Sequence, residues 1–484
     1  MKKIFVIILF MLNFNIISSQ KIDKPFNEYC DGVINIGNSV YIVGTTKNVP
    51  ISNGDDIIVI KYNFVTKNIT SKTFGSIYND RGYSINKTND DEIVISGESW
   101  ISSTYEQNSI ILKLDTNLNL IWWKSTNLKY RDGGIRTKEI SDKNFFTVGH
   151  TRSFLNHSIT DVLIYKSNNN GDTIFAKAID LGGNDFAFDF IELDEGKVLI
   201  AAEKGGFFVR SSDYDYCETH DADIYLIIID SLGNVLNMKS WGGQGHDLVR
   251  KIIKSPFEAN SFYLIGSTQN NGNSNFDILF LKFDSDLNEI WHKTYGTQST
   301  DYGVSLAYNY NNSTFFILST TTNSITNLPQ LTILVVDLDG QVINKLDTSI
   351  ENLTYSADLF ILPDNKIFVV GYTGNDFDNY NIFSQIVDYN LNILHQNSLS
   401  FASYNDFVDI YYENDYVNFK INYEQENIFN YKFLIYNSVG QFVYQIQNNS
   451  NNLIINKSNF SKGVYLGIFY LDSYTICRCK FIVF

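Results

Sequence analysis

The chain has 484 residues, of which 44% are hydrophobic and 19% are charged, and its net charge is −16. This hydrophobic share excludes a disordered chain and suffices for a sizeable core. The acidic balance argues against nucleic acid as a partner, because a phosphate backbone demands a basic face. Only five prolines, and an aromatic share of 15% carried by Tyr and Phe, favour β-structure.

The first nineteen residues have the order of a secretory signal peptide. Lys2 and Lys3 precede an apolar run over residues 4–17, and small residues follow it. The run is too short to span a membrane with its flanks, although a buried N-terminal helix or strand is an alternative. We therefore assign residues 1–19 as a signal peptide and expect an exported, soluble chain. No other stretch approaches eighteen apolar residues, so no transmembrane segment is expected.

The middle of the chain repeats one unit seven times at spacings of 51 to 54 residues, with one longer unit. The first marker is an apolar pair followed by a small residue: Gly44, Gly97, Gly149, Ala201, Gly266, Ser319 and Gly371. The second ends an apolar strand with a short polar residue: Asn63, Asp115, Ser167, Asp230, Asp284, Asp337 and Asp388. The third is a lysine or a polar substitute in the following strand: Lys72, Lys124, Lys177, Lys239, Lys293, Lys345 and Asn397. All three registers place a single insertion in the fourth unit.

Each unit has the pattern of four short antiparallel strands separated by turn residues. In one unit the expected strands cover Ser261–Gly266, Ile278–Asp284, Glu289–Tyr295 and Val304–Tyr308. Four strands repeating at about 50 residues are typical of a β-propeller blade. We therefore predict an all-β fold with a seven-bladed β-propeller of four-stranded blades over residues 20–412. A solenoid of the same period is the alternative.

An acidic residue often opens the strand after the third marker. This series comprises Asp31, Asp80, Asp132, Asp185, Asp247, Asp301 and Asp406, with none near Tyr355. Our preferred interpretation is turn capping, in which each carboxylate accepts backbone N–H bonds. The alternative is a ring of carboxylates at the channel mouth that could hold a cation or a polyhydroxyl ligand.

Residues 413–484 form a different module, predicted as a small C-terminal β-sandwich. The repeat ends after a strand at Phe407–Tyr412, for which pairing back to close the ring is one option. In the tail, a strand, a glycine turn at Gly440 and a second strand precede a Ser-Lys-Gly-Val-Tyr step and a final strand with Lys480. The step comprises Ser461, Lys462, Gly463, Val464 and Tyr465.

This tail resembles the C-terminal sorting domain of type IX secretion cargo in Bacteroidetes. The resemblance implies export across the outer membrane and recognition by the secretion machinery, with the tail often removed or exchanged for a surface anchor. It implies a location outside the cell or on the outer-membrane surface. The repeats also look like the propellers that such cargo often carries. This resemblance rests on the Gly266-Ser267-Thr268 step and on the run Trp291–Gly296. An ordinary sandwich capping the propeller is the alternative for the tail.

Motifs of catalysis and cofactor binding are missing from the sequence. It contains no HExxH, GxSxG, Walker loop or zinc-type Cys/His spacing, and we assign no catalytic, cofactor-binding or metal residue and no disulfide. The one irregular acidic segment is the fourth-unit insertion at Asp213–Asp223, with five carboxylates in eleven residues. It could ligate Ca²⁺ or stack a carbohydrate, but a solvated loop is preferred.

These observations favour a non-catalytic binding protein over an enzyme. Equivalent residues in every unit and one decorated loop are what a binding scaffold predicts. Its expected partners are the secretion machinery, through the tail, and a glycan or protein ligand on a propeller face. The alternative is an extracellular hydrolase that acts on polysaccharide or peptide through that face.

Overall fold

The computed structural model describes residues 28–483, with gaps. The gaps are residues 48–53, 65, 67, 77, 101–105, 155–158, 206–208, 211–212, 215–221, 259, 270–274, 363, 376–379, 400–407, 414–415, 422–430, 438–441, 449–451 and 472–473. The predicted signal peptide at 1–19 therefore lies outside the described residues, as do Gly440 and Asp406.

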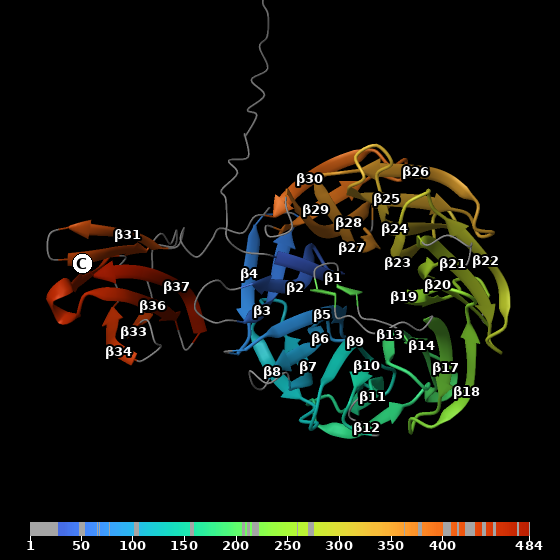
Figure 1. Ribbon diagram of the computed structural model, residues 1–484, viewed down its shortest axis with the longest axis horizontal. Helices are drawn as coiled ribbons and strands as arrows, with labels where there is room; N and C mark the ends of the chain where they lie inside the picture. The colour runs from blue at the N-terminus through green and yellow to red at the C-terminus, as the bar shows by residue number, and fades with distance from the viewer. Residues whose placement is uncertain are drawn as a thin grey trace, which may run out of the picture.

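Seven four-stranded antiparallel sheets form a ring, and each sheet uses one contiguous stretch of chain (Figure 1). Blades 1 to 3 contain β1 (Glu28–Ile36), β2 (Ser39–Lys47), β3 (Asp55–Asn63), β4 (Ile69–Phe74), β5 (Asp80–Lys87), β6 (Ile93–Trp100), β7 (Gln107–Leu114), β8 (Leu120–Ser125), β9 (Asp132–Glu139), β10 (Phe145–Thr151), β11 (Asp161–Ser167) and β12 (Thr173–Ile179). The first strand of each blade faces the centre, as β1, β5 and β9 show in Figure 1.

Blade 4 carries the predicted insertion. Its sheet runs β13 (Asp185–Glu192), β14 (Val198–Lys204), β17 (Asp223–Ile229) and β18 (Val235–Trp241), with the short helix η1 (Asp194–Gly196) after β13. Between β14 and β17 lies a separate two-stranded sheet, β15 (Val209–Arg210) with β16 (Asp213–Tyr214). The insertion therefore extends from the loop between the second and third strands of blade 4.

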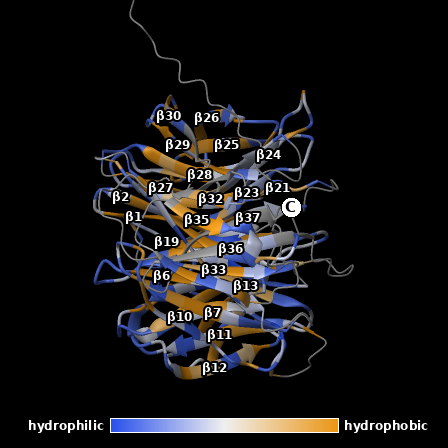
Figure 2. Ribbon diagram, turned by 90° about the vertical axis from the view of Figure 1, so that its left-hand side faces the viewer, coloured by the Kyte–Doolittle hydropathy of each residue, from blue (hydrophilic) through white to orange (hydrophobic). Residues whose placement is uncertain are grey.

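Three further blades complete the ring and confirm the predicted seven-bladed propeller. They contain β19 (Asp247–Lys254), β20 (Ser261–Thr268), β21 (Asp277–Asp284), β22 (Glu289–Tyr295), β23 (Tyr302–Asn309), β24 (Thr314–Thr322), β25 (Pro329–Val336), β26 (Val342–Thr348), β27 (Leu353–Ile361), β28 (Ile367–Gly374), β29 (Tyr380–Val387) and β30 (Ile393–Leu399). Figure 2 shows hydrophobic strands through the body of the ring and hydrophilic loops at its two faces.

The hydrophobic core lies between neighbouring blades, which explains why one blade alone would not fold. The ring closes in the same way, because Ile42 and Ile60 of blade 1 pack in one cluster with Phe368 and Val370 of blade 7. Burying both faces of each sheet removes apolar area from water at every joint. The chain therefore forms a closed ring and not a solenoid, and among the described strands none is shared between its first and last blades.

The second and third sequence markers together form a hydrogen-bonded contact between neighbouring blades. In blade 5, Asp284 accepts the Asn288 N–H at 2.8 Å and so closes the turn between the third and fourth strands. Lys239 of the preceding blade donates to the Asn288 side chain at 2.5 Å. The same bond between blades joins Lys72 to Asn119, Lys124 to Asp172 and Lys177 to Asn234. In blade 3 the capping residue is Asn168, so the predicted Ser167 is wrong by one position.

The tail forms two further sheets, outside the ring in Figure 1. They contain β31 (Val408–Glu413), β32 (Tyr416–Ile421), β33 (Tyr431–Asn437), β34 (Phe442–Asn448), β35 (Asn452–Asn456), the short helix η3 (Lys457–Asn459), β36 (Gly463–Leu471) and β37 (Tyr474–Val483). Phe419 of one sheet contacts Phe433 of the other at 5.1 Å between ring centroids. The option that the strand at 407–412 closes the ring is wrong, because β31 pairs with β32 inside the tail.

Among the residues that the structure describes, no helix has the length and apolarity that a membrane crossing requires.

Candidate functional site at the channel mouth

A β-bulge in the first strand of every blade positions the candidate site. In each case one extra residue stands on the inner strand, opposite the second strand of the same blade. These seven bulge residues are Asp31, Tyr83, Ile135, Phe188, Arg250, Val304 and Ala357. A bulge re-aims a side chain, and all seven line one cavity of about 480 Å³ in the channel.

The first sequence marker exists because of this bulge. A Cβ at Gly266 would stand 1.8 Å from the Leu248 carbonyl oxygen, and one at Gly44 would stand 1.8 Å from that of Tyr29. A side chain at either glycine would therefore require the local backbone to shift, and blade 6 must be arranged in this way, because Ser319 takes the equivalent position there. In blade 4 the residue paired at this position is Ala202, so the predicted Ala201 is one residue early.

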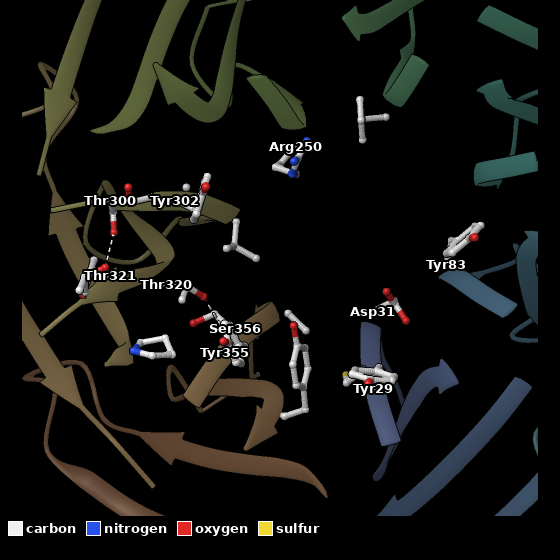
Figure 3. A pocket seen from close by; sticks show the side chains of 18 of the residues that line it. Tyr29, Asp31, Tyr83, Arg250, Thr300, Tyr302, Thr320, Thr321, Tyr355 and Ser356 are labelled. Carbon is white, nitrogen blue, oxygen red and sulfur yellow. Dashed lines mark hydrogen bonds between the residues drawn. The ribbon is translucent and has the colours of Figure 1, made fainter. Parts of the chain in front are cut away.

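The cavity combines positive charge with aromatic hydroxyl groups. Figure 3 shows Arg250, Asp31, Tyr83 and Tyr302 around its open centre, each from a different blade. Arg136 and Tyr355 also line it. Tyr355 stacks on the Tyr372 ring at 5.2 Å between centroids, so that wall is rigid and aromatic.

Arg250 is held in place from behind by a buried acid. Its Nη1 lies 3.1 Å from Glu203 Oε1, and its guanidinium lies 4.7 Å from the centroid of the Phe188 ring. Glu203 is fully buried and accepts the Val249 N–H at 2.8 Å. Burial raises the pKa of Glu203 to about 7, against the opposing effect of Arg250. This buried support fixes the direction of the arginine, as a preorganised binding group requires.

A second set of charges lies next to the bulge residues. Arg136 Nε is 3.4 Å from Asp189 Oδ1, and Lys138 Nζ is 2.7 Å from the same oxygen. Burial would raise the pKa of Asp189, but Lys138 and Arg136 outweigh it and hold that pKa below its usual value. Further round the ring, Lys251 lies 3.2 Å from Asp358. Blades 3 and 5 therefore place two arginines, Arg136 and Arg250, in the cavity lining of a chain with a strongly negative net charge.

The acidic series of the sequence caps turns and does not form a ring in the channel. Asp301 is fully buried and accepts the N–H groups of Thr297 at 2.5 Å and Thr322 at 3.1 Å. Asp80, Asp132, Asp185 and Asp247 are likewise fully buried. None of these five carboxylates lines the cavity, so the capping interpretation is confirmed for them and the ring of carboxylates is wrong.

One member of that series, Asp31, does not take the capping position. Asp31 is the bulge residue of blade 1 and lines the cavity, whereas Glu28 takes the capping position there. In blade 7 the position is held by Thr354, whose hydroxyl accepts the Ile350 N–H at 3.1 Å. The predicted lack of an acid near Tyr355 is therefore confirmed. Sequence spacing alone could not separate Asp31 from the series, because the bulge is set by strand pairing.

The predicted sorting residues 461–465 lie at the turn before β36 and at the start of that strand. The Tyr465 hydroxyl donates to the Ser461 carbonyl at 2.8 Å and lies 3.1 Å from the Ser461 hydroxyl. Lys462 is exposed, and Gly463 and Val464 open β36. Lys480 lies on the neighbouring strand β37, opposite Leu466. The acidic insertion at 213–223 lies largely outside the described residues, so its calcium hypothesis stays a prediction.

Comparisons with known proteins identify the tail. Residues 413–483 match the secretion system C-terminal sorting domain. The chain therefore carries a type IX sorting domain of the kind found in Bacteroidetes, which directs export to the cell surface or extracellular space and implies binding to the secretion machinery. No curated protein matches the sequence.

Solved structures resemble the propeller only as a fold. Puromycin hydrolase is 9% identical with a TM-score of 0.48, over 91% of this chain and 58% of that chain. The β-propeller domain of the Trilobed protease from Pyrococcus furiosus is 10% identical with a TM-score of 0.42, over 77% of this chain and 96% of that chain. Sqt1 from Chaetomium thermophilum is 9% identical with a TM-score of 0.45, over 76% of this chain and 87% of that chain. These likenesses say nothing about activity.

Proposed function

We propose that this exported protein is a non-catalytic binding protein whose ligand enters the channel mouth. The observation that carries the proposal is Arg250, which a bulge turns into the cavity and buried Glu203 holds in place. In this proposal residues 1–19 direct entry into the export route, and the seven blades from β1 to β30 form the binding propeller.

The cavity chemistry favours an acidic saccharide. Arginine binds carboxylates through paired, charge-assisted hydrogen bonds, which Arg250 and Arg136 supply. Tyr302, with part of the buried Tyr83, offers aromatic contact to a sugar, and Asp31 can accept hydrogen bonds from its hydroxyl groups. A cavity of about 480 Å³ suits a ligand of one or two sugar rings.

Non-catalytic binding is preferred over hydrolysis because the lining lacks a reacting pair. Among the described lining residues, Asp31 is the one carboxylate, whereas glycoside hydrolysis generally uses two. Ser356 is the one serine there, and its hydroxyl donates to the Ser319 carbonyl at 2.8 Å. A nucleophilic serine would instead need a neighbouring base.

The test is isothermal titration of the exported chain with oligogalacturonate, a neutral oligosaccharide and an acidic peptide. We expect binding of the oligogalacturonate, weakened about tenfold or more by Arg250→Met, because a charge-assisted hydrogen bond is lost. The matched control is Arg81→Met, since Arg81 is similarly buried and pairs with Asp55 at 3.1 Å outside the cavity. Equal loss in both variants, or release of shortened saccharide, would contradict the proposal. Binding of the peptide alone would change the ligand class.

A further inference from the structure

The joint between blades 3 and 4 brings three aspartates together. Asp161 opens β11, Asp185 opens β13, and Asp180 directly follows β12. One carboxylate oxygen from each lies within 4.8 Å of the others. This cluster is separate from the cavity described above, because none of the three residues lines it.

Two of these carboxylates are buried and hold an oxygen that lacks a hydrogen bond of normal geometry. Asp161 is 2% exposed and Asp185 is fully buried. Among the described residues, Asp161 Oδ2 has no hydrogen-bond partner, and Asp185 Oδ1 accepts no hydrogen bond of normal geometry, although the Gly205 N–H lies near this carboxylate. Buried polar atoms are normally satisfied, because leaving one unpaired costs its desolvation energy. Two such oxygens in one cluster indicate a missing positive partner.

Two further oxygens of the cluster accept backbone hydrogen bonds. Asp185 Oδ2 accepts the Leu181 N–H at 2.7 Å, and Asp180 Oδ1 accepts the Gly182 N–H at 2.7 Å. These bonds fix the orientation of both carboxylates. Asp185 Oδ1 is thereby preorganised, as a ligand of an ion would be.

This joint also departs from the repeat. Other joints pair two carboxylates, Asp56 with Asp80 or Asp277 with Asp301, and place a glycine beside them. Gly75 and Gly296 stand five residues before the capping aspartate, and a Cβ at Gly296 would lie 1.9 Å from Asp277 Oδ1. Asp180 takes the place of that glycine before Asp185. A third carboxylate therefore replaces the glycine in a single described joint.

We propose that Asp161, Asp180 and Asp185 bind a Ca²⁺ ion that links blades 3 and 4. Calcium takes six to eight oxygen ligands with flexible geometry, and three carboxylates supply the core of such a set. The exposed Asp180 leaves room for water to complete it. Mg²⁺ fits less well, because it retains most of its waters and uses one or two carboxylates.

The electrostatics of the cluster agree with this geometry. Burial raises the pKa of Asp161 to about 6, with Asp180 adding to the effect. The pKa of Asp185 also rises to about 6, first through burial and then through Asp161 and Asp180, against the N–H groups of Leu181 and Gly205. A divalent cation would reverse both effects. The nearby basic group is Lys204, which pairs with Asp185 across the strands and has its Nζ beside Gly182.

The test titrates the chelator-treated exported chain with CaCl₂ and MgCl₂ at pH 7.5, by equilibrium dialysis and thermal unfolding. We expect one Ca²⁺ per chain, a rise in Tm, and at least tenfold weaker binding of Mg²⁺. Asp180→Gly introduces the residue found at three other joints, as Gly75, Gly242 and Gly296, so it should fold normally and bind Ca²⁺ at least tenfold more weakly. The matched control is Asp339→Asn, an exposed turn aspartate outside the cluster.

Three results would overturn the site. The first is no bound Ca²⁺, which would leave Lys204 or bound protons to offset the charge. The second is Ca²⁺ binding that Asp180→Gly leaves unchanged, which would place the ion elsewhere, such as the acidic insertion. The third is equal weakening in Asp339→Asn. The saccharide titration of the proposed function has a separate readout, so the two proposals can fail independently.

Discussion

Glu203 and Arg250 meet at 3.1 Å behind the channel wall, where the carboxyl is fully buried and the guanidinium reaches the cavity. Through this ion pair, the protonation state of buried Glu203 affects how strongly the Arg250 guanidinium can attract a ligand in the cavity. Burial raises the pKa of Glu203 to about 7, so the acid changes charge near neutral pH. When Glu203 is protonated, it is neutral and no longer offsets the positive charge of Arg250.

The first prediction is that binding of an anionic ligand weakens as the pH rises through about 7. Ionised Glu203 competes with the ligand for the guanidinium of Arg250, so affinity should fall about tenfold between pH 6 and 8. Glu203→Gln keeps a hydrogen-bonding oxygen but cannot ionise, and its affinity should stay near the wild-type value at pH 6. Titration calorimetry with oligogalacturonate at both pH values measures this. A wild-type pH profile retained in Glu203→Gln would assign the effect to another group.

The second prediction concerns stability against pH. Burial raises the pKa of Asp132 to about 6, against the hydroxyls of Thr151 and Ser153. A raised folded-state pKa stabilises the fold below the unfolded value of about 4, and this stability is lost as the pH rises through about 6. The free energy of unfolding should therefore fall from pH 4.5 to 7.5, with Asp132 contributing roughly 2 kcal/mol of that fall.

Asp132→Asn provides the check on that contribution. The amide oxygen can still accept a hydrogen bond, but the side chain does not titrate, so the fall in unfolding free energy should shrink. Urea unfolding at pH 4.5, 6 and 7.5 measures it. Asp230 is a suitable control, because its turn N–H groups lower its pKa and its titration lies below this range. An unchanged slope in Asp132→Asn would show that Asp132 is ionised throughout.

The third prediction tests the bulge that builds the channel wall. In Gly266→Ala the new Cβ would stand 1.8 Å from the Leu248 carbonyl oxygen, which is backbone and cannot turn aside. We expect a loss of about 2–4 kcal/mol in unfolding free energy. The control Gly32→Ala places its Cβ 3.3 Å from the Ile85 side chain and should cost far less. Equal effects in chemical denaturation would mean that the bulge relaxes freely.

Sequence periodicity predicts most of the fold, because each marker has the same structural role in successive blades. Glycine at Gly266 is forced by the bulge, and Asp284 and Lys239 belong to one joint between blades. The two errors of one position, at Ala201 and Ser167, occur where neighbouring residues are equally small or polar. Spacing predicts the period, and only strand pairing fixes the register.

The candidate sites follow from the sequence much less directly. Arg250 and Asp31 stand at ordinary strand positions, and their direction depends on a bulge that pairing alone reveals. From the sequence, the insertion at 213–223 is the candidate Ca²⁺ site, because its acidic residues are close together in the chain. Asp161 and Asp185 are 24 residues apart and meet only through packing of two blades. One signal was available, since Asp180 stands where other units have glycine.

The last prediction separates folding of the sorting tail from its recognition. The Tyr465 hydroxyl holds the turn at Ser461 by a 2.8 Å hydrogen bond, and its ring packs on Phe460 at 5.1 Å. Tyr465→Phe keeps the ring and loses that bond, so the tail should lose about 1 kcal/mol and export should persist. Lys462 is exposed, so Lys462→Gln should leave thermal unfolding unchanged but reduce export if the machinery binds this charge.

Cell fractionation with antibody detection measures the outcome, and deletion of residues 413–484 sets the value for lost export. That deletion should leave the propeller inside the cell envelope, since the matched sorting domain spans residues 413–483. Export of Lys462→Gln at the wild-type level would place recognition on another part of the tail surface. Loss of export in Tyr465→Phe, with unfolding unchanged, would instead make the hydroxyl itself a recognition group, because the ring packing is preserved in that variant.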